Sequence, residues 1–399
     1  MTSSSASLST RVPELDGLRG LAILLVLVYH YTGGADAHFS FWPRHILGAL
    51  SIGWSGVDLF FVLSGFLIGG ILLDARNSPR YFRAFYMRRV FRILPIYYVW
   101  TLLYGVLLLY VLWREPGRFP LSLNDLSQVP LHLLFLQNIW FTRLFFPSVW
   151  FAVTWSLAVE EQFYLITPPL IRFFDVRKVT WILAATICAA PLIRTTVYRI
   201  TQDSFAASFP MPCRADSLAC GVLLAIAWRK PAFHDFLRAH PRLLRNLLLV
   251  LFLGVGALLW WLVRPDNLVQ ISIGYTWIAL FYACLLLFTL KETQTWLAAL
   301  MRWRFLRWLG GISYCVYLIH LTFNFIAHAL LHGGLPEIYT ARGVAAAVLA
   351  LAATLAVASL SWRFFEKPLI RRGHTYSYGE SSASATPRDV LMDTAPAQP

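Results

Sequence analysis

The chain has 399 residues, of which 58% are hydrophobic and only 14% are charged. Soluble globular domains carry about 25% charged residues, so this composition argues against a soluble enzyme, a disordered protein and a disulfide scaffold. The net charge of +14 would favour nucleic-acid binding in a soluble protein, but in a membrane protein it indicates positively charged cytoplasmic loops. We therefore expect a polytopic membrane protein that works in the lipid bilayer and binds no nucleic acid.

Apolar segments long enough to cross a ~30 Å hydrocarbon layer, which takes about 20 residues, recur along the chain. They lie near 17–34, 54–73, 91–112, 149–173, 179–196, 214–228, 246–263, 271–290, 309–331 and 343–362. The stretch Leu131–Asn138 is too short to cross and predicts an interfacial or re-entrant piece. The predicted fold is all-α, a polytopic membrane helix bundle of about ten transmembrane helices.

Lysine and arginine residues predict the direction of these helices. With a cytoplasmic N-terminus, basic loops such as 76–92 and 229–245 lie inside, and every inner loop is at least as basic as its neighbouring outer loops. An even number of helices then leaves both termini cytoplasmic, in a multi-pass protein of the cell inner membrane. The membrane domain spans 13–372, and the ends 1–12 and 373–399, rich in Ser, Thr and Ala, are expected to be disordered.

The first predicted helix carries ionisable side chains, which are costly in lipid and therefore mark candidate functional sites. Arg19 and His30 are eleven residues apart, or about three turns, so they share one helix face at an axial separation of ~16.5 Å. Asp16 lies on the same face one turn before Arg19, where an ion pair is expected. An interfacial histidine beside Tyr29 is the alternative for His30, but the face shared with Arg19 favours a function.

The residues around Arg19 and His30 resemble the signature of the acyltransferase-3 membrane family. Pro-Glu-Leu-Asp-Gly-Leu-Arg-Gly-Leu-Ala begins at residue 13, and ten residues separate its arginine from the histidine. Six further segments resemble family motifs in the same order, over about residues 13–370: 56–66, 88–97, 154–164, 214–221, 313–320 and 366–368. The family includes bacterial O-antigen, exopolysaccharide and macrolide O-acyltransferases, and seven motifs in order make the resemblance specific.

The resemblance implies both an activity and roles for particular residues. In the family the arginine and histidine that match Arg19 and His30 are essential, and the histidine is the favoured catalytic residue. A cytoplasmic Arg-x-x-Arg pair, here Arg89 and Arg92, is implicated in acyl-CoA handling. The chain is thus expected to be an O-acyltransferase that transfers an acyl group, most simply acetyl from acetyl-CoA, to a hydroxyl of a carbohydrate or of a glycosylated or macrolide metabolite.

The physical chemistry of Arg89 and Arg92 agrees with acyl-CoA as a donor substrate. No bound cofactor is expected. The two arginines are three residues apart on one helix face, and guanidinium groups bind phosphate in a bidentate fork. CoA carries several phosphates, so a basic patch at the inner mouth suits it. The alternative is a patch that only follows the positive-inside rule and attracts anionic lipid headgroups.

Other polar residues in the predicted helices have two interpretations each. Glu160 could orient His30 or hold a proton if their helices meet, or could form a structural pair with an arginine such as Arg214. Ser64 could let its hydroxyl approach the thioester of acyl-CoA, but the adjacent Gly65-x-x-x-Gly69 pattern favours close helix packing.

Two further polar positions are expected to be structural. Asp58 is expected to be a polar anchor, and His320 a buried histidine satisfied within the bundle. The five cysteines show no CxxC spacing, and no sequence motif supports a metal site.

The mechanism expected from these residues is general-base catalysis. A hydroxyl needs a base at the moment of attack, and the ordinary pKa of histidine, ~6.5, suits that task. His30 would take the acceptor proton, or would form an acyl-histidine relay, while Arg19 would fix the donor or stabilise negative charge. Rival classes are a transporter or flippase of a lipid-linked sugar or metabolite and a glycosyl polymerase, and the acceptor and the oligomeric state stay open at this point.

Overall fold

A computed structural model of the chain describes residues 12–32, 50, 52–114, 126, 128–140, 148–261, 267–331 and 333–379; the side chains of 259–261 are not described. Helices account for all the regular secondary structure in these ranges, which contain no strand. The all-α fold class predicted from the sequence is therefore confirmed.

Each of the segments predicted to cross the membrane coincides with one long helix. The long helices are α1 (Pro13–Tyr31), α3 (Gly56–Asp74), α4 (Tyr81–Arg114), α7 (Trp155–Phe173), α8 (Val176–Thr201), α10 (Met211–Trp228), α12 (Leu243–Trp261), α13 (Tyr275–Lys291), α15 (Arg304–Leu331) and α16 (Ala341–Ser361). The main difference is in α4, which begins at Tyr81, because the arginine-rich stretch predicted as an inner loop continues the helix.

Short helices connect these elements. They are η2 (Ile52–Ser55), α5 (Gln128–Leu133), α6 (Gln137–Trp140), α9 (Ser204–Ser208), α11 (Pro231–Ala239), η4 (Gln270–Gly274), α14 (Trp296–Met301), η5 (Trp362–Glu366) and α17 (Lys367–His374). The stretch Leu131–Asn138, predicted to be too short to cross, is divided between α5 and α6.

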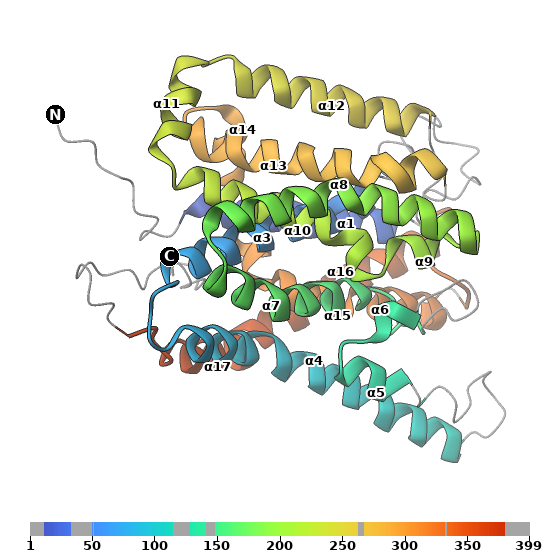
Figure 1. Cartoon of the computed structure of the whole chain (residues 1–399). Coiled ribbons are helices and arrows are strands. Elements are labelled where there is room, and N and C mark those ends of the chain that lie inside the picture. The colour runs from blue at the N-terminus through green and yellow to red at the C-terminus, as the bar shows by residue number, and fades with distance from the viewer. Residues whose placement is uncertain are drawn as a thin grey trace.

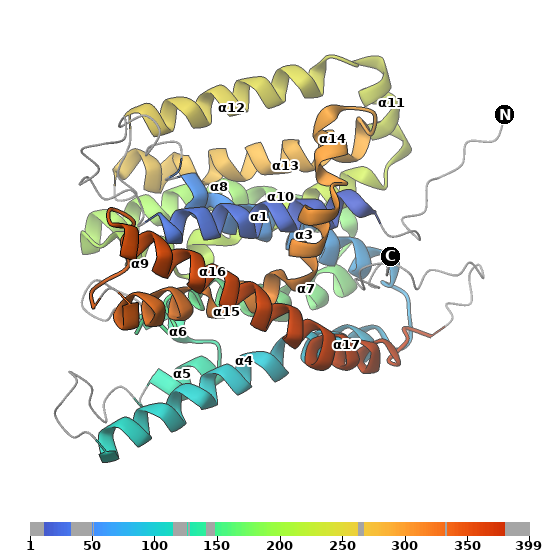
Figure 2. The ribbon, with the colours of Figure 1, turned by 180° about the vertical axis from the view of Figure 1, so that it is seen from behind.

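The long helices run roughly side by side, with α12 and α4 at opposite edges of the bundle and α1, α3 and α10 near its centre (Figures 1 and 2). Burial follows this order, because α3 and α10 are the most buried of the apolar helices while α8 and α16 are among the least. Outward faces are apolar: Val106 on α4, Phe252 on α12 and Val348 on α16 are all exposed. Such faces suit contact with hydrocarbon rather than water.

Among the described residues, seven helices are long and apolar enough to cross a membrane: α4, α8 and α15 by themselves, and α3, α10, α13 and α16 together with the short helices that adjoin them. A bent pair, α11 with α12, meets at 83° and would make an eighth span if it counts as one. Helices α1 and α7 have 19 residues each, which is about 28 Å, but each carries three charged residues. Two of these charged residues, Arg19 and Glu160, belong to the candidate active site.

Glycines bring α1 and α15 into backbone contact. A Cβ atom on Gly20 would lie 1.9 Å from the carbonyl oxygen of Leu306, and one on Gly310 would lie 2.0 Å from that of Asp16. Only glycine permits so close an approach. Both helices run from the same end of the bundle to the other, so residues at equal distances beyond this contact also meet.

Helices α3 and α10 are joined in the same way. A Cβ atom on Gly65 would lie 2.0 Å from the carbonyl oxygen of Leu218, and one on Gly221 would lie 2.2 Å from that of Val62. The close-packing interpretation of the Gly65-x-x-x-Gly69 pattern is therefore confirmed.

The start of α1 and the end of α17 lie at the same end of the bundle (Figures 1 and 2). Residues 1–11 and 380–399, which make up most of the two ends predicted to be disordered, lie outside the described residues. The first part of the predicted tail packs on α4, where Arg88 Nε donates a hydrogen bond of 2.9 Å to the carbonyl oxygen of Tyr376.

Candidate active site

The side chain of His30 meets a second histidine, His320 of α15. His30 Nδ1 lies 3.0 Å from His320 Nε2, and the two ring centroids are 4.9 Å apart. His320 is completely buried, whereas His30 keeps part of its surface exposed. The pair forms because His30 and His320 each lie ten residues beyond the glycine, Gly20 or Gly310, at which the parallel helices touch.

Backbone carbonyls around the pair determine which nitrogen atoms carry protons. His320 Nδ1 lies 2.8 Å from the carbonyl oxygen of Tyr317 and 3.1 Å from that of Val316, so it must donate and its Nε2 must accept. His30 Nδ1 faces this acceptor and the carbonyl oxygen of Val26 at 3.0 Å, so it also carries a proton. The unprotonated nitrogen of neutral His30 is therefore Nε2.

Neighbouring hydrogen bonds fix the two helices around the pair. Asn324 Nδ2 donates to the carbonyl oxygen of His30 at 3.3 Å. The hydroxyl of Tyr31 lies 3.3 Å from the carbonyl oxygen of His320 and 3.2 Å from Thr354 Oγ1 of α16. Three helices thus hold the imidazole rings in place.

A second group of polar side chains lies between α3, α4 and α7. Ser64 donates a hydrogen bond of 2.8 Å to Glu160 Oε1, and the hydroxyl of Tyr164 lies 3.1 Å from both Ser64 Oγ and Glu160 Oε2. The guanidinium of Arg89 lies over the Tyr164 ring at 5.2 Å from its centroid. The carboxylate and the arginine therefore contact the same phenol from different sides.

Arg19 and Arg92 belong to the same group by electrostatics. Arg19 lies 3.8 Å from Asp16, which confirms the expected ion pair, and its side chain is 16% exposed. It also interacts electrostatically with Arg89 and Glu160. Arg92 interacts electrostatically with Arg19, Arg89 and Glu160, so the charges of three guanidinium groups act on the Glu160 carboxylate. We call Arg19, Ser64, Arg89, Arg92, Glu160 and Tyr164 the arginine cluster.

The predicted site residues thus fall into two groups. Arg19, Arg89, Arg92, Ser64 and Glu160 lie together in the arginine cluster, and His30 lies about 16.5 Å from Arg19 along α1, eleven residues at 1.5 Å each. The carboxylate of Glu160 bonds Ser64 and Tyr164, while the ring of His30 bonds Val26 and His320. Glu160 therefore does not orient His30 in this structure. Among the described residues, the side chain that bonds the His30 ring is that of His320.

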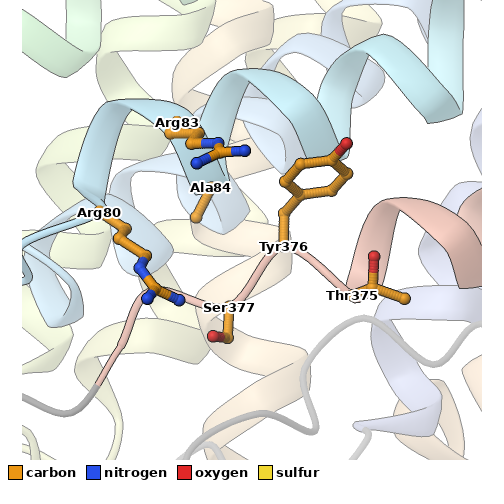
Figure 3. Close-up of a pocket in the computed structure, with 6 residues that line it drawn as sticks. All are labelled: Arg80, Arg83, Ala84, Thr375, Tyr376 and Ser377. Atoms are coloured by element: carbon orange, nitrogen blue, oxygen red, sulfur yellow. The ribbon is translucent and has the colours of Figure 1, made fainter.

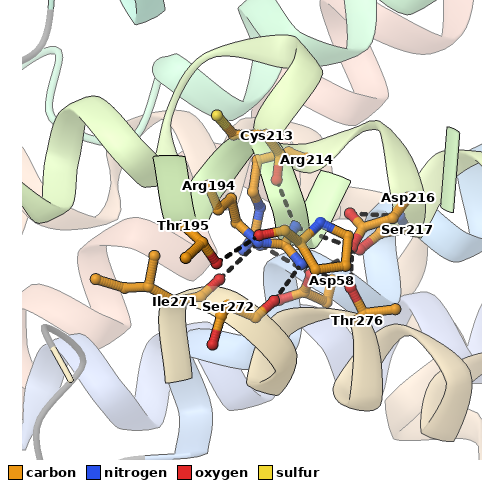
Figure 4. Close-up of polar contacts among 11 residues, drawn as sticks. Asp58, Arg194, Thr195, Cys213, Arg214, Asp216, Ser217, Ile271, Ser272 and Thr276 are labelled. Carbon is orange, nitrogen blue, oxygen red and sulfur yellow. Dashed lines mark hydrogen bonds and ion pairs between the residues drawn. The ribbon is translucent and has the colours of Figure 1, made fainter. Parts of the chain in front are cut away.

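The alternative for Glu160, a structural pair with an arginine such as Arg214, does not hold for Arg214. Arg214 bonds Asp58 at 2.8 Å, and Ser217 donates to the same carboxylate oxygen at 2.8 Å. Arg194 bonds Asp216 at 2.9 Å. These side chains are almost completely buried between α3, α8, α10 and α13 (Figure 4), which agrees with Asp58 as a polar anchor.

The sequence analysis did not predict the partner of His320 and assigned no role to Glu366, although it named the motif 366–368. His320 is satisfied within the bundle, as expected, but its partner is His30. The equal spacing of both histidines from a glycine was a visible signal for this contact. Glu366 closes the π-helical turn η5 and accepts a hydrogen bond of 2.9 Å from Ser361. It interacts electrostatically with Arg92, so η5, which continues α16, lies next to the arginine cluster.

The chain is similar in sequence to known O-acetyltransferases. The chain is 30% identical over 381 residues to the peptidoglycan O-acetyltransferase OatA of Listeria monocytogenes, an alignment that covers 91% of this chain and 56% of that protein. It is 25% identical over 395 residues to the O-acetyltransferase OatA of Staphylococcus aureus, covering 96% and 61%. The chain therefore spans little more than half the length of these relatives.

The family assignment follows from a family model rather than from one relative. No solved structure matches the chain. The model described as an acyltransferase domain, that of the acyltransferase-3 family, matches residues 12–363, which include α1 through α16 and every residue of the two polar groups except Glu366. The chain belongs to the acyltransferase-3 family.

Proposed function

We propose that the chain is a membrane O-acetyltransferase that moves an acetyl group from acetyl-CoA to a hydroxyl of a carbohydrate. The observation that carries this proposal is the contact between His30 and His320, which leaves His30 Nε2 as a base in a family of acyltransferases. A transporter or flippase needs no such base. The names of the relatives, a peptidoglycan O-acetyltransferase and an O-acetyltransferase, support both the acyl group and the carbohydrate acceptor.

The reaction assigns His30 the role of general base. The acceptor oxygen attacks the thioester carbonyl carbon while its proton passes to His30 Nε2. The carbon–sulfur bond then breaks, and the departing thiolate takes the proton from His30 as CoA thiol. The positive charge on His30 is stabilised meanwhile by the hydrogen bond from its Nδ1 to His320. His320 is a positioning residue in this scheme.

The arginine cluster is proposed to bind the donor. Arg19, Arg89 and Arg92 supply three guanidinium groups, and such groups bind phosphate well. In the described part of the chain, Asp16 and the carboxylates of Glu160, Glu161 and Glu366 act on them. The axial distance of ~16.5 Å from Arg19 to His30 supports donor binding by Arg19 rather than direct stabilisation of the reacting carbonyl. Ser64 and Glu160 then hold the cluster together through Tyr164.

The membrane arrangement that suits this reaction has ten spans and two cytoplasmic termini. It adds α1, α7 and α12 to the seven helices that are apolar enough by composition. Arg19 of α1 pairs with Asp16 and interacts electrostatically with Glu160 of α7 inside the bundle, which makes these charges tolerable in lipid. The arginine cluster would then face the cytoplasm, where acetyl-CoA is found, and His30 would lie nearer the outer side in the inner membrane.

The test is a reaction with purified full-length chain in lipid nanodiscs. Acetyl-CoA and an oligosaccharide of peptidoglycan are supplied separately and together, and free CoA thiol and acetylated sugar are both measured. We expect thiol and acetylated sugar in equal amounts only when both substrates are present. Movement of the sugar across a vesicle membrane without acetylation would instead support the transporter.

A further inference from the structure

A basic pocket lies at the start of α4, away from both polar groups of the candidate active site. Its volume is about 270 Å³, and it is lined by Arg80, Arg83, Ala84, Thr375, Tyr376 and Ser377. Figure 3 shows the guanidinium of Arg83 directed toward the ring of Tyr376, with Arg80 near Ser377. The pocket therefore forms between two segments almost 300 residues apart in the sequence.

Specific contacts fix the C-terminal segment that closes this pocket. The Arg80 backbone N–H lies 3.4 Å from the carbonyl oxygen of Tyr378, and the guanidinium of Arg88 lies 4.9 Å from the Tyr378 ring centroid. The same guanidinium donates to the carbonyl oxygen of Tyr376. Arg88 thus holds the segment to α4 and leaves Arg80 and Arg83 to line the pocket.

Within the described residues, the two arginines of the pocket have no carboxylate partner. Neither Arg80 nor Arg83 forms an ion pair with a carboxylate in the part of the chain that the structure describes, although Arg229 pairs with Asp74 and Arg302 with Glu14. Arg83 instead lies over the Tyr376 ring, 5.7 Å from its centroid. Two guanidinium groups, an aromatic ring and the Ser377 hydroxyl suit a phosphate-bearing ligand with a flat ring.

The pocket lies nearer than the arginine cluster to the end of the bundle at which α4 begins. Arg83 precedes Arg89 by six residues on α4, or about 9 Å along the axis, and the arginine cluster in turn precedes His30. Acyl-CoA is elongated, with nucleotide phosphates at one end and the thioester at the other. The order pocket, arginine cluster, histidine pair matches a ligand extended along the bundle.

We propose that this pocket binds the nucleotide end of acyl-CoA, its ribose phosphate at Arg80 and Arg83 and its adenine against Tyr376. This inference rests on the proposed acyl-CoA donor. The arginine cluster keeps the diphosphate of the donor, and the pocket adds a separate subsite for the nucleotide. Anionic lipid headgroups carry the same phosphate chemistry, so the test must separate the two sources.

The test compares R80A/R83A with a matched control, R177A/K178A, which removes two exposed cations at the start of α8. The KM values for acetyl-CoA and for acetyl-pantetheine, which lacks the nucleotide, are measured in nanodiscs of zwitterionic lipid. Losing two charge-assisted contacts should raise the KM for acetyl-CoA by about 10- to 100-fold. The KM for acetyl-pantetheine and both kcat values should not change, and the control should match wild type.

Three results would overturn the inference. Equal KM increases for both donors, in a variant that unfolds at the wild-type temperature, mean that the pocket does not recognise the nucleotide. An unchanged KM for acetyl-CoA excludes the pocket as the nucleotide site. An effect seen only in nanodiscs with anionic lipid assigns the pocket to lipid headgroups.

Direct binding of CoA separates this inference from the proposed function. If wild type binds CoA and R80A/R83A does not, the pocket is supported even when no acetyl transfer is found. If transfer occurs and both proteins bind CoA equally, the reaction stands and the pocket assignment fails.

Discussion

His30 of α1 and His320 of α15 share a contact of 3.0 Å between Nδ1 and Nε2, although 290 residues separate them in the chain. The contact follows from the geometry of two parallel helices that touch at Gly20 and Gly310. Equal rises of ten residues then bring both rings to the same depth. A small-residue contact at one end of the helix pair therefore sets the position of the base at the other.

Substitution of His320 tests its role as a positioning residue. H320A removes the acceptor for the Nδ1 proton of His30, and loss of ring orientation should lower kcat by about 10²-fold. The KM for acetyl-CoA should stay near wild type, because the arginine cluster is remote. H320Q offers an amide oxygen as acceptor and should recover part of the rate.

The pH profile provides the second readout for His320. Acetyl transfer in wild type should fall as the pH is lowered, because protonated His30 cannot accept the acceptor proton. H320A should shift the midpoint of this profile. An unshifted profile with a lower kcat, together with a lower melting temperature, would mean that His320 is only structural.

Alanine at Gly20 should separate α1 from α15. The new Cβ would lie 1.9 Å from the Leu306 carbonyl oxygen, and such overpacking costs about 1–3 kcal/mol of stability. The matched control is G311A on α15, where no atom lies within 4 Å of the new Cβ. We expect a lower melting temperature and lost activity for G20A and near wild-type values for G311A. Equal behaviour of the two variants would contradict the glycine contact.

The arginine cluster should act on the donor rather than on the acceptor. R89A/R92A removes two of its three guanidinium groups and should raise the KM for acetyl-CoA by at least about tenfold, since hydrogen bonds to charged groups contribute ~1.5–3 kcal/mol each. The KM for the sugar should change little. Steady-state kinetics with each substrate varied in turn provides the measurement, and equal changes in both KM values would indicate a merely topological patch.

The buried ion pair of Asp58 and Arg214 predicts a different pattern. Removal of one partner leaves an uncompensated buried charge, which costs about 3–5 kcal/mol. D58L should therefore unfold at a clearly lower temperature than wild type, while D58L/R214M should regain most of that loss. A double variant as unstable as D58L would contradict the pairing.

Much of the fold could be predicted because helices in lipid depend on local apolar length. The segment 309–331 was visible as a helix, as was the face shared by Arg19 and His30. Helix pairing was harder to predict, because it depends on contacts between distant small residues such as Gly20 and Gly310. For the same reason the partners of Glu160 and Arg214 were not predicted correctly. The packing role of Gly65 was predicted correctly, because its pattern is local in sequence.

Acetyl transfer by H30Q in nanodiscs, beside wild type and H320Q, tests directly whether His30 is the general base. Glutamine keeps the size and polarity of the side chain but cannot take a proton. We expect H30Q to bind CoA as tightly as wild type, to melt at a similar temperature and to transfer acetyl about 10²- to 10⁴-fold more slowly. Transfer by folded H30Q at the wild-type rate would contradict the assignment of His30 as the general base.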